Sequence, residues 1–127
     1  MGGLRAMRSR DAGPATSSEL AARQTFVQAW VRTTGGASQS LDVGYQVTSI
    51  TDAALGLLDV TWTQPFTGAT TYAVIAAIQS SDLVVEHVQI DNATPPTSSA
   101  VRIECITSST QNAVDPASGY FVLACGV

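Results

Sequence analysis

The feature that most constrains the fold is an apolar alternation preceded by a short turn. Leu58, Val60 and Trp62 recur at every second position, with polar residues between them. This period of two is typical of a half-buried β-strand, because successive side chains of a strand point to opposite faces. The stretch Tyr45–Asp52 before it is rich in β-branched residues, and a short connection containing Gly56 joins the two. The pattern predicts a β-hairpin.

Length and composition extend this prediction to the whole chain. The 127 residues suffice for one domain that buries a core without disulfides or metals. Only 13% of the residues are charged, and there is no Lys. Soluble helices normally carry many Lys and Glu residues, so this composition favours an all-β protein. No apolar run approaches the roughly 18 residues of a membrane span, and residues 1–16 lack the apolar core of a secretory signal. We therefore expect a protein made in the cytoplasm, with no membrane partner.

The charge is unevenly distributed along the chain. Residues 1–25 contain four Arg and two acids, which gives +2, whereas residues 26–127 contain two Arg and eight acids, which gives −6. An acidic body without clustered basic residues argues against a nucleic-acid partner. Residues 1–25 are interpreted as an arm, either a flexible leader or a segment that docks on an acidic partner surface. Arg5, Arg8 and Arg10 are the candidate attachment residues.

The body, residues 26–127, continues the strand pattern after a short helix expected at Ser17–Gln24. About seven strands at a spacing of about ten residues predict an antiparallel β-sandwich of jelly-roll or immunoglobulin-like type. Gly44 suggests a bulge, because an isolated Gly in a strand pattern often marks one. Tyr72–Ile78 is apolar on both faces, which is typical of a central strand. Besides the hairpin and this strand, we expect strands at residues 26–32, 40–46, 83–90, 100–107 and 120–125.

No motif for catalysis, a cofactor or a metal is recognisable. The only histidine, His87, lies in a Val-rich strand beside Glu86, where a satisfied strand residue is far more common than a general acid–base pair. Cys105 and Cys125 lie in predicted strands outside any metal-ligand spacing, and we interpret them as buried, reduced thiols in preference to a bridge between neighbouring strands. The sequence thus predicts a structural or binding module with no cofactor.

Several short segments of the body carry a resemblance to a known family. They are Ala29–Val31, Tyr45–Asp52, Leu58–Thr63, Pro65–Phe66, Tyr72–Val74, Val101–Ile103 and Val114–Pro116. In their order and spacing they resemble a small β-rich domain of tailed-bacteriophage virion proteins, with its AWV-like start, NVSSITD-like turn, GxYTVxF-like strand and late VDP step. The resemblance covers about residues 27–127. Gln46 departs from the usual Asn, Leu57 and Leu58 replace a GDY-like run, and the N-terminal arm is not shared.

The resemblance implies a non-enzymatic virion protein of a tail fibre, head fibre, spike or decoration module. It implies a homotrimer with other virion proteins as partners, and it supplies no catalytic residues. The alternative is a β-sandwich that binds carbohydrate, such as a host surface glycan, through exposed aromatic residues. That alternative requires Trp30, Tyr45, Trp62 and Tyr120 to be partly exposed, whereas the structural interpretation places them in a core or a subunit interface.

Overall fold

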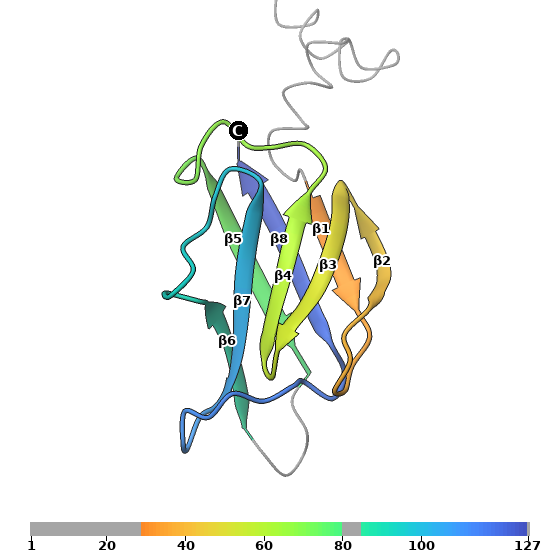
Figure 1. Ribbon diagram of the computed structural model, residues 1–127, viewed down its shortest axis with the longest axis vertical. Helices are drawn as coiled ribbons and strands as arrows, with labels where there is room; N and C mark the ends of the chain where they lie inside the picture. The colour runs from red at the N-terminus through yellow and green to blue at the C-terminus, as the bar shows by residue number, and fades with distance from the viewer. Residues whose placement is uncertain (1–28, 80–84, 127) are drawn as a thin grey trace, which may run out of the picture.

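The protein is all-β in the part of the chain that the computed structural model describes, residues 29–79 and 85–126. Eight strands form two antiparallel sheets of four, with no helix among the described residues (Figure 1). Sheet A has the order β2 (Leu41–Tyr45), β1 (Ala29–Thr33), β8 (Tyr120–Gly126) and β5 (Tyr72–Ile78). Sheet B has the order β3 (Val47–Ala54), β4 (Leu57–Trp62), β7 (Ala100–Thr107) and β6 (Glu86–Ile90). The helix expected at Ser17–Gln24 lies outside the described residues.

The two sheets face each other across one hydrophobic core, and sheet B lies in front of sheet A in the view of Figure 1. Alternate side chains of β1, β4, β5, β7 and β8 point into the core, as a period of two requires, whereas β2 is exposed along its length. In β7 the residues expected inside, Val101, Ile103 and Cys105, are buried, while Arg102 and Glu104 between them are partly exposed. The core residues of both sheets are Ala29, Val31, Leu58, Val60, Trp62, Phe66, Val101, Ile103, Cys105, Tyr120, Val122 and Ala124.

The predicted hairpin is confirmed as β3 and β4, which pair along their length. Its turn is tight, because Leu55 and Gly56 alone separate the two strands. Gly56 has a φ of +71°, and a Cβ there would lie 2.6 Å from the carbonyl oxygen of Cys105. Both observations require glycine at this position, since other residues rarely adopt such a φ.

The structure corrects three expectations about the strands. The eight described strands match the eight stretches expected but exceed the count of about seven, because Gln46, with a φ of 57°, divides the extended stretch of residues 41–54 between the two sheets. Gly44 pairs regularly with Val31, and the register shift lies between Arg32 and Thr33, where β2 has one additional residue, Asp42. The strand expected to be central, β5, lies at the edge of sheet A and pairs only with β8.

Candidate functional site

The outward face of sheet A is apolar across all four strands. Cross-strand pairing places side chains in rows, because directly opposed residues of antiparallel strands point to the same side. One row is Tyr45, Trp30, Leu123 and Ile75, and the next is Val43, Arg32, Phe121 and Ala77. Cys125 and Ala73 begin a third row. We call the uncharged members of this set the apolar face: Val43 and Tyr45 of β2, Trp30 of β1, Phe121, Leu123 and Cys125 of β8, and Ala73, Ile75 and Ala77 of β5.

Several side chains of the apolar face are open to solvent. Ile75 is 58% exposed, Tyr45 50%, Val43 47% and Phe121 43%. The rings of Trp30 and Phe121 lie 6.3 Å apart between centroids in a tilted arrangement. Single exposed apolar side chains are ordinary, but a contiguous patch over a whole sheet usually marks a surface that contacts something else.

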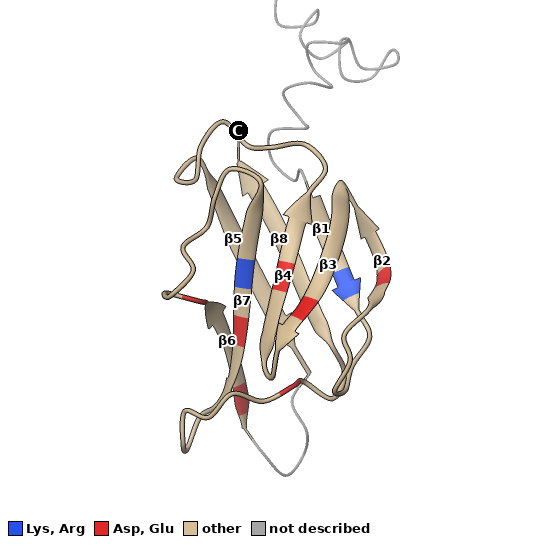
Figure 2. Ribbon diagram, viewed as in Figure 1, with Lys and Arg blue, Asp and Glu red and all other residues tan. Residues whose placement is uncertain are grey.

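One ion pair interrupts this surface. Arg32 Nε lies 3.5 Å from Asp42 Oδ2, and both side chains are about half exposed or more. Strands β5 and β8 carry no charged residue (Figure 2). An exposed pair of this kind contributes little to stability, about 0–1 kcal/mol. Its consequence is that the charges of the described residues in the strands of sheet A cancel.

The outward face of sheet B has the opposite character. Arg102 donates two hydrogen bonds to Asp59, of 2.6 and 2.8 Å, and Gln89 donates one of 2.9 Å to Glu104. The hydrogen bonding of Arg102 to the Asp59 carboxylate is the main reason that the pKa of Arg102 is raised. We call this surface the polar face, with the members Ser49, Thr51, Asp59, Thr61, Gln89, Arg102 and Glu104.

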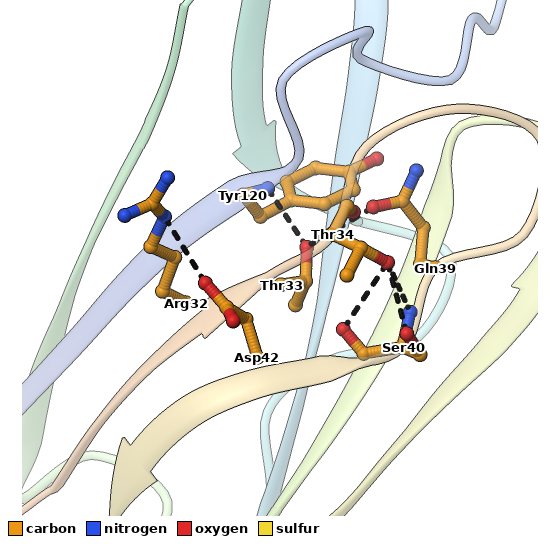
Figure 3. A network of polar contacts seen from close by, with 7 residues as sticks. All are labelled: Arg32, Thr33, Thr34, Gln39, Ser40, Asp42 and Tyr120. Carbon is orange, nitrogen blue, oxygen red and sulfur yellow. Dashed lines mark hydrogen bonds and ion pairs between the residues drawn. The ribbon is translucent and has the colours of Figure 1, made fainter.

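Below the apolar face, a buried polar network joins distant segments of the chain (Figure 3). The hydroxyl of Thr33, at the end of β1, accepts a 2.9 Å hydrogen bond from the backbone N–H of Tyr120 and donates one of 3.0 Å to Gln39 Oε1. The backbone N–H of Gln39 donates in turn to Asp52 Oδ2 at 3.0 Å. These bonds fasten the loop between β1 and β2 to both sheets.

The side chain of Tyr120 extends this network to the hairpin turn. Its hydroxyl donates a 3.0 Å hydrogen bond to the carbonyl of Gly56, whose N–H donates a 2.7 Å bond to Asp115 Oδ1. Burial raises the pKa of Tyr120 well above its usual range and is also the main reason that the pKa of Cys105 rises to about 12. Both groups therefore stay protonated at neutral pH, and a protonated thiol is a poor nucleophile. The arrangement is suited to holding the sheets together.

The structure separates the four aromatic residues singled out in the sequence. Trp62 and Tyr120 are buried in the core, 3% and 2% exposed, and Trp62 packs edge-on against Phe66. Trp30 and Tyr45 are cross-strand neighbours on the apolar face. The attachment candidates Arg5, Arg8 and Arg10 lie outside the described residues.

Sequence reasoning missed the other large residues of the apolar face: Ile75, Phe121 and Leu123. The signal was present, because β1, β5 and β8 each have apolar residues at both inward and outward positions. In β5 considered alone, this property is typical of a central strand. In three strands that share one sheet, it marks a sheet with two apolar faces.

The two cysteines occupy different environments. Both thiols are free; Cys105 points into the core from β7, whereas Cys125 lies in β8 of the other sheet. The expectation that both are buried is wrong for Cys125, which is only partly buried because its side chain points outward beside Ala73. The ring of His87 lies 3.2 Å from the Ser108 hydroxyl.

No described group of three or more His, Cys, Asp or Glu side chains could hold a metal ion. A helix long and apolar enough to cross a membrane is likewise not found in residues 29–79 and 85–126. Comparisons with protein-family models, curated proteins and solved structures found no match. The function is therefore inferred from the residues of this chain.

Proposed function

We propose that the chain is a non-enzymatic structural protein of a tailed-bacteriophage virion, a fibre, spike or decoration module that works by packing against other protein surfaces. The single observation that carries this proposal is the apolar face of sheet A. A protein whose task is assembly has a use for a large apolar surface, since removal of that surface from water drives association.

The order of the short motifs from Ala29–Val31 to Val114–Pro116 supports the virion assignment. The resemblance they carry also supports a homotrimer, as does an apolar fraction of 45% with only 13% charged residues. We further propose that the two sheets form a β-sandwich, since they share one core. The type of sandwich, jelly-roll or immunoglobulin-like, stays a prediction. The strand order differs from an immunoglobulin sheet in one respect, because β1 lies between β2 and β8, whereas the first strand of an immunoglobulin sheet lies at an edge.

The arm provides the attachment in this proposal. Residues 1–25 carry +2 against −6 for the rest of the chain, so Arg5, Arg8 and Arg10 can meet carboxylates on a larger virion surface. Each copy in an oligomer repeats the contact, so weak individual contacts add up to a firm attachment.

Deletion of residues 1–24 tests this role. We expect a soluble, β-rich body with unchanged self-association that is no longer incorporated into particles, as measured by mass spectrometry of purified virions. The matched control is the full chain with Arg5, Arg8 and Arg10 changed to Lys, which keeps the charge and should keep incorporation. Truncated protein at normal occupancy on the particle would show that the arm is not the anchor.

A second candidate function, glycan binding, is favoured by one specific observation. Trp30 and Tyr45 lie side by side on the apolar face, and the polar side chains of Arg32 and Asp42 flank them. Exposed aromatic rings stack on sugar rings, and such flanking groups can bond to hydroxyls. A glycan array probed with the wild-type chain and with Trp30→Ala tests it: binding by the wild type that the variant loses supports this function, and no binding excludes it for the sugars presented.

A further inference from the structure

We propose that the apolar face is the contact surface between two copies of this chain, packed face to face about a two-fold axis that runs parallel to the strands between β1 and β8. This inference rests on the proposed assembly function and names the partner and the contacts, with a two-fold pair in place of the trimer that the resemblance implies. Two properties of the face point to a second copy: its extent and its charge.

The extent of the face suits a pair. Four strands about 4.8 Å apart, each with about 3.3 Å per residue, give a surface of roughly 15–20 Å in each direction. A surface of that extent covered by side chains buries several hundred Å² on each copy. The flat area of such a face is at most about half of the roughly 800 Å² that each partner of a standard interface buries, which corresponds to a weak, reversible pair.

The charge distribution also favours a copy approaching on this side. Residues 26–127 carry −6, so two bodies repel each other at most orientations. Among the described residues of the sheet A strands, the only charges are those of Arg32 and Asp42, which cancel. The remaining described acids lie outside the strands of sheet A, so face-to-face packing through that sheet would not bring them into the contact (Figure 2). These acids lie in sheet B or in loops: Asp52, Asp59, Glu86, Asp91, Glu104 and Asp115.

The two-fold axis fixes which strands of the two copies meet. A two-fold axis along the strands sets β2 of one copy over β5 of the other, and β1 over β8. In one row this places Val43 over the small side chain of Ala77 of the partner copy. Packed sheets lie roughly 10 Å apart.

The rows define which residues meet. Because rotation about this axis keeps each row at its own level, Tyr45 lies over Ile75 of the partner copy and Trp30 over Leu123 of the partner copy. In the next row, the Arg32 guanidinium lies over the ring of Phe121 of the partner copy, a favourable cation–π arrangement. The single cation of the face thus has a place within the pair.

Complementary charge variants of Tyr45 and Ile75 test this geometry in the full chain. Within one chain the two residues lie in β2 and β5, the opposite edges of sheet A, with two strands between them. A direct effect of one on the other therefore requires a second copy. Tyr45→Lys and Ile75→Glu each place an unpaired charge at both ends of the interface, and we expect each to raise the dissociation constant at least about a hundredfold.

Mixing the two variants is the decisive step. In a mixed pair the introduced lysine faces the introduced glutamate at one end, while the native Tyr45 and Ile75 meet at the other. Light scattering should give twice the 13.2 kDa chain mass for the wild type, one chain mass for each variant alone, and twice the chain mass for the equimolar mixture. The matched controls, Ser49→Lys and Ser49→Glu on the polar face, should associate like the wild type, and circular dichroism verifies that every variant is folded.

The outcomes separate this inference from the proposed function. A wild type with one chain mass, variants that associate alone, or a mixture that stays unassociated would overturn the pairing. A mass of three chains would overturn the two-fold pair but support the trimer that the resemblance implies. A chain that pairs as described but is missing from purified particles would leave the interface standing and overturn the virion role.

Discussion

The outward faces of the two sheets are built from the same strand geometry but have opposite surfaces. On sheet B, Arg102 and Asp59 form a double hydrogen bond, and Gln89 reaches Glu104 on the neighbouring strand. On sheet A, the equivalent outward positions hold residues such as Ile75 and Phe121, which are 58% and 43% exposed. Antiparallel sheets commonly keep one face in the core and one in water. Sheet B follows this rule, whereas sheet A is apolar on both faces.

The difference identifies the outward side of sheet A as a surface whose apolar character the stability of the fold does not explain. The inward faces of both sheets supply the core, so the fold is accounted for without the outward side chains of sheet A. Exposed apolar side chains such as Ile75 bring no folding benefit in proportion to their size, because water still covers them in the isolated chain. A surface kept apolar without a folding benefit is best explained by a partner that covers it.

The largest expected effect is on the free energy of unfolding, and it distinguishes Leu58 in the core from Ile75, an aliphatic residue of similar size on the apolar face. Leu58→Ala should lower the free energy of unfolding by about 2–5 kcal/mol, because it leaves a cavity between the sheets where Leu58 is fully buried. Ile75→Ala should change it by less than about 0.5 kcal/mol in dilute solution, and should instead weaken the rise of the melting temperature with protein concentration. Urea unfolding at low concentration and thermal scans over a concentration series measure the two effects. An equal loss of stability in both variants would mean that the apolar face is part of the folding core.

A smaller effect contrasts the thiol inside the core with the thiol on the face. Burial raises the pKa of Cys105 to about 12, whereas an unfolded cysteine titrates near 8.5. Between these values the folded chain retains a proton that the unfolded chain releases, so stability is fully present below about pH 8.5 and declines as the pH rises toward 12. The decline is at most about 1.4 kcal/mol per pH unit for one proton, and Tyr120 adds to it above about pH 10 because its pKa is also raised.

Urea unfolding at several pH values from 8 to 10 measures this decline. Cys105→Ala should make the decline of stability with pH shallower. The same variant should also lose stability by an amount that does not depend on pH. The matched control is Cys125→Ala, which removes the thiol of the apolar face and leaves Cys105 in place, and it should keep the decline of the wild type. A wild type whose stability is constant over this range would contradict the burial of the Cys105 thiol.

Local pattern was enough to predict the strands but not their neighbours. The alternation of Leu58, Val60 and Trp62 gave the hairpin, since a period of two is a property of each strand by itself. The position of β5 at a sheet edge could not be read in this way, because it depends on pairing with β8, more than forty residues further along the chain. The same limit applies to Tyr120, whose hydroxyl bonds to Gly56, 64 positions away.

The candidate site was predictable only in fragments. Trp30 and Tyr45 were singled out as aromatic residues, but so were Trp62 and Tyr120, which lie in the core. Composition does not distinguish an aromatic side chain that points into the core from one that points outward, because that depends on how the strands pair. The apolar face appears as one surface only after the strand order brings β2, β1, β8 and β5 together.

The unmodified chain carries its own reporter for the central claim that a second copy covers the apolar face. Cys125 lies on that face and Cys105 lies in the core, so the labelling rate of Cys125 by a thiol reagent reports coverage of the face, with Cys105 as an internal control. We expect the Cys125 rate to fall as the protein concentration rises through the range in which light scattering shows association. In Ile75→Glu the rate should stay fast throughout, and Cys105 should stay unlabelled in both proteins. A Cys125 rate that is the same at every concentration, in the wild type as in Ile75→Glu, would contradict the account.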